Sequence, residues 1–161
     1  MIDNDKITVL FICMGNICRS PSAQGVFECL IAKKGLSKQF RIDSAGTHSY
    51  HIGSKPDARS IFFAKQRAID ISKQQARKVN KADFEEFDFI IAMDDDNYLN
   101  LLAICPAQYQ GKVYEMMQFA PHTNYTSVPD PYYGGEKGFD LVLDLLENAC
   151  VGLLREIKKL K

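Results

Sequence analysis

Short apolar runs alternate along the chain with longer segments in which apolar residues recur at helical spacing. The runs are rich in β-branched and aromatic residues, which is typical of strands buried on both faces of a sheet. They cover residues 7–12, 40–43, 88–93 and 112–115. Because they alternate with helical segments, they predict an α/β fold. We expect a single open, four-stranded parallel sheet with helices on both faces and right-handed crossovers.

The segments between the runs predict the helices. They cover residues 21–34, 56–68, 82–87, 94–102 and 139–160. The first two begin with a proline, which suits the first turn of a helix because its missing N–H costs nothing there. Ser20 is then expected to be the N-cap of the first helix. The last helix carries an apolar stripe that ends at Leu160 and that we expect to cover the sheet.

The junction between the first strand and the first helix has the composition of an anion-binding loop. Gly15 and Asn16 tolerate left-handed backbone, so the loop can turn its N–H groups inward. Inward N–H groups at a helix N-terminus bind anions, and open α/β sheets bind ligands at the carboxyl ends of their strands. The predicted phosphate-binding loop comprises Met14, Gly15, Asn16, Ile17, Cys18 and Ser20.

Two further residues of this junction bring reactive chemistry. Cys13 lies on the predicted floor of the loop, where a field that favours anions also favours the thiolate form of a cysteine. Arg19 can turn back over the loop and bind two oxygens of an oxyanion. A nucleophile beneath a phosphate-shaped loop suits covalent phosphoryl transfer. The alternative is a structural cysteine followed by an unrelated arginine, which the surrounding strand, loop and helix signals disfavour.

Composition and charge narrow the range of partners. A chain of 161 residues with 46% hydrophobic and 25% charged residues suits one domain, covering residues 1–161. The formal net charge is zero, so we expect neither nucleic acid nor a membrane as a partner. Five scattered cysteines and a polar N-terminal segment without the pattern of a signal peptide favour a reducing compartment, the cytoplasm. No metal site is expected, because the histidines at positions 48 and 51 lack further ligands nearby.

Residues 13–21 closely resemble the signature of the low-molecular-weight protein tyrosine phosphatases. The resemblance continues in order through residues 43–47, 92–94 and 130–134, and so covers nearly the whole chain. It implies an enzyme without cofactor or metal that hydrolyses phosphotyrosine in proteins, and also aryl phosphates. We expect inorganic phosphate and other oxyanions to inhibit it, and relatives of this kind imply a monomer or a weak dimer.

The resemblance also implies the catalytic roles. Cys13 would attack phosphorus and form a cysteinyl-phosphate, Arg19 would bind the equatorial oxygens, and Asp130 would act first as general acid and then as general base. Asp130 stands between two prolines, which stiffen its backbone and suit a carboxylate that must be held over a leaving group. Taken alone, an Asp-Pro pair is also common in turns.

Residues outside the loop are expected to support it. The resemblance places Ser44 in a hydrogen-bond network with Asn16 and Ser20. Many relatives carry a histidine where Gln74 stands, and we expect this difference to affect the rigidity of the loop rather than the chemistry. The resemblance places Asp94 behind the catalytic arginine, although Asp94 also suits the N-cap of the helix that follows it.

The resemblance further implies aromatic pocket walls and a redox partner for the nucleophile. Tyr50, Tyr132 and Tyr133 are the expected walls, and the depth of such a pocket would select phosphotyrosine over phosphoserine. Ile17 fits the same preference, because relatives that prefer phosphoarginine carry a smaller threonine at that position. Cys18 would form a reversible disulfide with the oxidised nucleophile, or else it is a packing cysteine.

Three other interpretations fit parts of the sequence. Asp94 and Asp96 after a strand resemble a magnesium-dependent aspartyl phosphatase, but Tyr98 stands where that family has threonine or valine. Arsenate reduction would need resolving cysteines downstream, and none lies between Cys29 and Cys105. A module that binds phosphotyrosine without turnover would usually lack one of the three catalytic residues.

Overall fold

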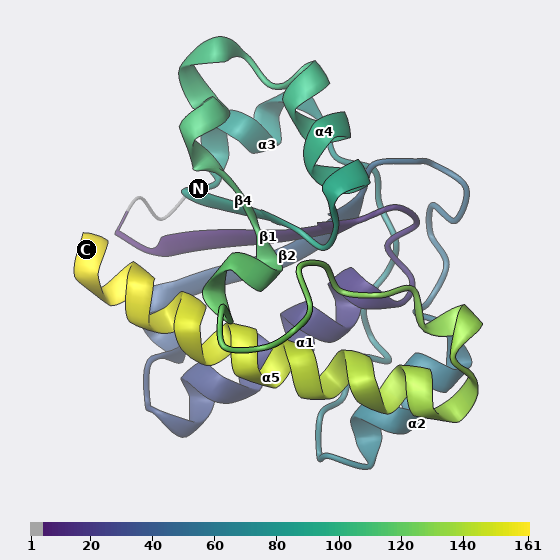
Figure 1. The fold of residues 1–161 in the computed structure, drawn as a ribbon. Helices are drawn as coiled ribbons and strands as arrows, with labels where there is room; N and C mark the ends of the chain where they lie inside the picture. The colour runs from purple at the N-terminus through teal and green to yellow at the C-terminus, as the bar shows by residue number, and fades with distance from the viewer. Residues whose placement is uncertain (1–4) are drawn as a thin grey trace.

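The computed structural model describes residues 5–161, except for the side chain of Tyr133. Its strands form one open parallel sheet in the order β2-β1-β3-β4 (Figure 1). The strands are β1 (Ile7–Cys13), β2 (Phe40–Gly46), β3 (Phe89–Ala92) and β4 (Val113–Glu115). The predicted fold class, an α/β fold on a four-stranded parallel sheet, is therefore confirmed.

Helices cover both faces of the sheet. In Figure 1, α1, α2 and α5 lie below the sheet, and α3 and α4 lie above it. Their bounds are α1 (Arg19–Lys33), α2 (Ala58–Lys65), α3 (Lys81–Glu86), α4 (Asp95–Ile104) and α5 (Gly135–Leu160). Short 3₁₀ segments form η1 (Ser37–Gln39), η2 (Ala107–Lys112), η3 (Met116–Phe119) and η4 (Pro131–Tyr133). Within residues 5–161, no helix combines the length and the apolar character that crossing a bilayer requires.

Strand β1 organises the molecule because its alternate residues belong to two different cores. Val9 and Phe11 pack in the core that α1 and α5 cover, whereas Leu10 and Ile12 pack in the core beside α3 and α4. Side chains of successive strand residues point to opposite faces, so a strand covered on both sides must be apolar throughout. The last residue of this central strand, Cys13, therefore lies at the carboxyl edge of the sheet, between its two neighbouring strands.

Two predictions about the ends of elements are wrong. The sequence predicts that the second strand ends at residue 43, but β2 continues to Gly46, which lies opposite Cys13 in the parallel register with β1. Ser20 is not the N-cap of the first helix, because α1 already begins at Arg19. Ser20 lies instead within the first turn of the helix, and its hydroxyl group faces the loop.

Two helices also differ from their predicted lengths. The second is shorter, because the side chain of Asp57 accepts hydrogen bonds from the N–H groups of Arg59 and Ser60 and caps α2 at that point. The last helix begins four residues earlier than predicted, at Gly135. Its apolar stripe lies in the core, except for Leu160, which is 63% exposed. Residues 158–161 are all exposed, so the last turn of α5 projects beyond the core.

Candidate active site

The loop after β1 wraps around the sulfur atom of Cys13. The Cys13 side chain is buried, and its Sγ accepts a hydrogen bond from the N–H of Asn16 at 3.3 Å and lies 3.0 Å from the hydroxyl oxygen of Ser20. Asn16 has a φ angle of 58°, in the left-handed region that the Gly-Asn pair predicts. This backbone conformation turns the N–H of the loop toward the sulfur instead of toward solvent.

Backbone contacts with the end of β2 fix the base of the loop. A Cβ added at Gly46 would lie 2.7 Å from the carbonyl oxygen of Met14, so only glycine allows this close approach. The N–H of Thr47 donates to the carbonyl of Cys13 at 2.9 Å, and the N–H of His48 donates to that of Met14 at 3.0 Å. The extension of β2 to Gly46 thus forms part of the site.

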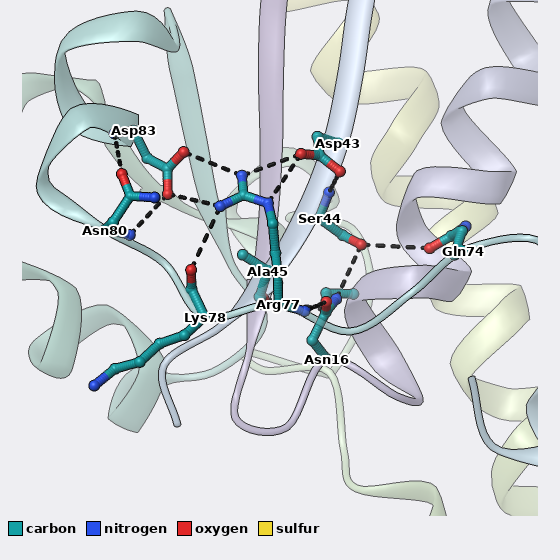
Figure 2. Close-up of polar contacts among 10 residues, drawn as sticks. Asn16, Asp43, Ser44, Ala45, Gln74, Arg77, Lys78, Asn80 and Asp83 are labelled. Atoms are coloured by element: carbon teal, nitrogen blue, oxygen red, sulfur yellow. Dashed lines mark hydrogen bonds and ion pairs between the residues drawn. The ribbon is translucent and has the colours of Figure 1, made fainter. Parts of the chain in front are cut away.

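The side chain of Asn16 is the centre of a hydrogen-bond network (Figure 2). Its Nδ2 donates to the hydroxyl groups of Ser20 and Ser44, at 2.9 Å in both cases. Its Oδ1 accepts from the backbone N–H of Arg77 at 3.0 Å. With one acceptor and two donor contacts satisfied, this buried amide fixes the left-handed residue in one orientation.

Gln74 joins this network at the position where many relatives carry a histidine. Its Oε1 accepts from the hydroxyl of Ser44 at 3.3 Å, and its Nε2 donates to the backbone carbonyl of Pro21 at 3.0 Å. The glutamine therefore uses both ends of its amide, one on the network and one on the first turn of α1. The sequence alone did not indicate whether an amide could take this place.

Arg19 is held on its outer side by an acidic residue and a backbone carbonyl. Its Nη1 donates to Asp94 Oδ2 at 2.7 Å and to the carbonyl of Val128 at 3.0 Å. The other carboxylate oxygen of Asp94 accepts from the N–H of Asn97 at 2.7 Å and caps α4. Asp94 therefore has both expected roles.

The loop opens on a cavity of about 190 Å³. The residues that line it are Cys13, Met14, Gly15, Ile17, Cys18, Arg19, His51, Asp130 and Tyr132. Asp130 enters from the segment before α5, 117 positions along the chain from the cysteine, and its Oδ1 accepts from the N–H of Tyr132 at 2.9 Å. A thiol, a guanidinium group and a carboxyl group thus line the same small cavity.

Tyr132 forms one wall of the cavity and is tied to α2. Its hydroxyl donates to Asp57 Oδ2 at 2.7 Å, and the guanidinium carbon of Arg59 lies 4.7 Å from the centre of its ring. Burial and the hydrogen bond to Asp57 raise the pKa of Tyr132 above its ordinary range. Burial opposes ionisation of Asp57, but hydrogen bonds from Tyr132 and from two N–H groups outweigh it and lower the pKa of Asp57.

Tyr50, the expected opposite wall, does not line the cavity in this structure. The Tyr50 side chain is 73% exposed and stacks on His48, with ring centres 5.4 Å apart. His51 lines the cavity instead, and its ring lies against Gly15, where an added Cβ would come within 3.0 Å of it. The missing side chain of the glycine makes room for the imidazole, which the sequence analysis had considered only as a metal ligand. The side chain of Tyr133, the third expected wall, lies outside the described part of the structure.

Cys18 lies in the same loop and differs from Cys13 in its surroundings. Burial is the main cause that raises the pKa of the Cys18 thiol to about 11, and the charge of Asp57 adds to it. Hydrogen bonds with Ser60 and Tyr132 act in the opposite direction but are weaker. Cys18 is therefore a neutral thiol at physiological pH, although it lines the cavity.

Comparison with known proteins decides the family. The family model described as low molecular weight phosphotyrosine protein phosphatase matches residues 8–161. The chain belongs to this family. The resemblance on which the sequence analysis relied is thereby confirmed for almost the full length of this phosphatase.

Individual relatives agree with this assignment. The low molecular weight phosphotyrosine protein phosphatase of Schizosaccharomyces pombe is 42% identical over 144 residues, which cover 88% of this chain and 92% of that protein. The human protein of the same name is 36% identical over 158 residues, 97% of this chain and 99% of that protein. A crystal structure of a protein tyrosine phosphatase from Entamoeba histolytica, with Hepes in the active site, superposes with a TM-score of 0.93 at 45% identity. That structure covers 96% of this chain, and 98% of its own chain is matched.

Proposed function

We propose that this phosphatase hydrolyses phosphotyrosine in proteins, and aryl phosphates, through a cysteinyl-phosphate intermediate on Cys13. The observation that carries the proposal is the shared cavity, on which the Cys13 sulfur, the Arg19 guanidinium and the Asp130 carboxyl group all open. The N–H of Asn16 donates a hydrogen bond to the sulfur, and the hydroxyl of Ser20 lies against it. The family assignment supports the reaction class.

In the first step the Cys13 thiolate attacks phosphorus. The S–P bond forms while the P–O bond to the phenol breaks, and Asp130 gives its proton to the departing oxygen. Asp94 and Val128 both hold Nη1 of Arg19, which orients the rest of the guanidinium fork. We assign the Nε–Nη2 edge of that fork, together with loop N–H groups, to the equatorial phosphate oxygens.

In the second step water attacks the phosphorus of the intermediate. Asp130, now a carboxylate, takes a proton from the water, the P–S bond breaks, and inorganic phosphate leaves with the thiolate restored. The positive charge that stabilises both transition states comes from Arg19 and the loop, so the proposal requires no metal ion.

The position of Cys13 supports selectivity for tyrosine. Its side chain is only 3% exposed, at the floor of the cavity, so a phosphate must be carried down to it by a long side chain. A phenyl ring between Tyr132 and His51 can do so, and the short side chain of phosphoserine cannot.

Hydrolysis of para-nitrophenyl phosphate in excess EDTA tests this proposal with three proteins: the parent, Cys13→Ser and Asp130→Ala. We expect the parent to keep its turnover in EDTA, Cys13→Ser to lose it, and Asp130→Ala to lose about two orders of magnitude. Turnover that EDTA abolishes, or that survives in Cys13→Ser, would contradict the cysteine mechanism. A parent without turnover would favour a phosphotyrosine-binding module.

We extend the proposal to peroxide regulation in the cytoplasm, where the five free cysteines would remain reduced. Peroxide would oxidise the Cys13 thiolate to a sulfenic acid, which condenses with the Cys18 thiol to a disulfide and releases water. The raised pKa of Cys18 keeps it protonated, so peroxide reacts with Cys13 first. After peroxide and then a thiol reductant, we expect Cys18→Ala to recover much less activity than the parent. Equal recovery would leave Cys18 as a packing residue.

A further inference from the structure

Arg77 connects the loop around Cys13 with two acidic residues that lie outside the cavity (Figure 2). Its Nη1 and Nη2 donate to the two oxygens of Asp83, at 3.0 and 3.1 Å. Its Nε donates to Asp43 Oδ2 at 3.1 Å, and its Nη2 forms an ion pair with the same oxygen at 3.1 Å. The guanidinium group thus binds a carboxylate from β2 and a carboxylate from α3.

Both acidic partners are themselves fixed. The Asp83 side chain is 5% exposed, and its Oδ2 also accepts from the N–H of Asn80 at 2.8 Å, which completes the capping box of α3. Asp43 Oδ1 accepts at 2.8 Å from the N–H of Ser44, the residue whose hydroxyl belongs to the Asn16 network. The guanidinium group therefore has one buried anchor, Asp83, and one partly exposed anchor, Asp43, and each of them also accepts a hydrogen bond from a backbone N–H.

The backbone of Arg77 reaches the loop directly. Its N–H donates to Asn16 Oδ1 at 3.0 Å, and its carbonyl accepts from the N–H of Gly46 at 2.8 Å. Lys78 forms a parallel bridge with Gly46, and the N–H of Val79 donates to the Gly46 carbonyl at 2.9 Å. Residues 77–79 thus lie along the end of β2, at the edge of the sheet.

From these contacts we infer that Arg77 is a positioning residue for the phosphatase reaction, an inference that rests on the function proposed above. Its guanidinium group anchors residues 77–79 between Asp43 and Asp83, and the Arg77 N–H then holds the side chain of Asn16. Asn16 tolerates left-handed backbone better than most residues do, but its side-chain contacts select that conformation from the others open to it. Loss of the anchor therefore lets Asn16 relax, and the loop loses the shape that binds phosphate.

The test compares Arg77→Met with Arg67→Met as a matched control. Arg67 also binds several carboxylates, those of Asp140, Asp144 and Glu147 on α5, but it does not contact the loop. Two readouts report on the loop: the inhibition constant of inorganic phosphate, and the rate at which iodoacetate alkylates Cys13 at fixed pH. A purely structural role of Arg77 would change the melting temperature but neither of these.

We expect Arg77→Met to weaken phosphate inhibition and to lower kcat/KM by about tenfold each, because a small misplacement of catalytic groups has a large effect on rate. Alkylation of Cys13 should slow as well. Arg67→Met should stay within about twofold of the parent in all three measurements. Arg77→Lys keeps the charge but not the two-sided fork, so it should fall between the parent and Arg77→Met; it carries the test if the methionine variant does not fold.

A double-mutant cycle shows whether Arg77 acts through Asn16. In an Asn16→Ala background, Arg77→Met should lower kcat/KM by less than about twofold further, because the group it positions is already gone. The inference would be overturned if the effects of Arg77→Met and Asn16→Ala on kcat/KM were fully additive. It would also be overturned if Arg77→Met lost thermal stability but kept the parental inhibition by phosphate. A parent that shows no Cys13-dependent turnover would instead contradict the proposed function, so the two failures are distinguishable.

Discussion

At the scale of single residues, the site depends on how the amide of Asn16 is satisfied. Three of its contacts are to groups outside the loop or at its end: the hydroxyls of Ser20 and Ser44, and the N–H of Arg77. Gln74 in turn orients Ser44, with an amide where relatives use an imidazole. A substitution at Gln74 should therefore change the rigidity of the loop while leaving the reacting groups in place.

We predict that Gln74→Ala lowers kcat for para-nitrophenyl phosphate by about threefold to tenfold, since the Ser44 hydroxyl loses its acceptor. The free energy of unfolding should fall by about 1 kcal/mol, because two partly buried hydrogen bonds are lost. Steady-state kinetics and urea unfolding measure these effects, with Gln75→Ala at the exposed neighbouring position as control. An unchanged kcat would show that Ser44 keeps its orientation without Gln74.

Cys13 and Arg19 could be predicted from the loop motif around them. Asp130 could be predicted only from the resemblance to the family, because an aspartate between prolines is also typical of a turn. The wall opposite Tyr132 could not, because the direction of a ring in a turn depends on the space beside it. That space exists above Gly15, and His51 fills it instead of Tyr50.

Arg77 was missed for a similar reason. One of its partners, Asp43, lies 34 positions away, and the residue that its N–H holds, Asn16, lies 61 positions away. No local pattern marks such a residue, because its role exists only once β2, α3 and the loop have come together. Figure 2 shows Asp43 and Asp83 at the guanidinium group of Arg77, and Asn16 beside its backbone.

At the scale of elements, the N-terminus of α4 is joined to the active site by one carboxylate. Asp94 caps the helix with Oδ1 and orients Arg19 with Oδ2. The sequence indicated both roles as alternatives, and the structure shows that they are simultaneous. One substitution that removes only the charge beside Arg19, and another that also removes the helix cap, can separate the effects of the two roles on activity and on stability.

Asp94→Asn should keep the cap, since asparagine is as good an N-cap as aspartate, but lose the charge beside Arg19. We expect kcat/KM to fall at least tenfold and the free energy of unfolding by about 1–2 kcal/mol. Asp94→Ala should lose activity to a similar degree but about 1 kcal/mol more stability, because the cap is lost too. Kinetics and urea unfolding of both variants test this. Parental activity in Asp94→Asn would contradict the orienting role.

The ends of elements show where local composition misleads. Ser44, Ala45 and Gly46 have the composition of a turn, yet pairing with β1 extends the strand through them. Ser20 before Pro21 has the composition of an N-cap, yet the helix begins two residues earlier than predicted, at Arg19. In both places long-range pairing or the geometry of the loop outweighs local preference.

At the scale of the whole molecule, acidic side chains gather at the carboxyl edge of the sheet. Glu115, at the end of β4, is partly buried there beside Asp94 and Asp95. Burial is the main cause that raises the pKa of Glu115 from an ordinary 4.5 to about 7, and the hydrogen bond and charge of Asp95, with the charge of Asp94, add to it. The folded state therefore binds a proton at Glu115 more tightly than the unfolded state does.

Stability should consequently depend on pH in a defined window. Between pH 4.5 and about 7 the folded state holds more protons at Glu115 than the unfolded state, so this group's contribution to stability is lost as the pH rises. Relative to the parent, Glu115→Gln should gain about 1 kcal/mol in free energy of unfolding across this window, because solvent screens this partly exposed group. Urea unfolding below pH 4.5 and above pH 7 measures the change, with the exposed Glu85→Gln as control. A constant difference at both pH values would contradict the assignment.

The most direct test of the whole account is to trap the covalent intermediate in Asp130→Ala. Para-nitrophenolate leaves without needing a proton, so Cys13 should still be phosphorylated, whereas hydrolysis of the intermediate lacks its base and slows. Asp130→Ala is mixed with para-nitrophenyl phosphate, quenched in denaturant, and analysed by intact and peptide mass spectrometry. The account predicts one phosphoryl group, on the peptide that contains Cys13, and none in Cys13→Ser. A phosphoryl group on another residue, or turnover with no covalent adduct, would contradict it.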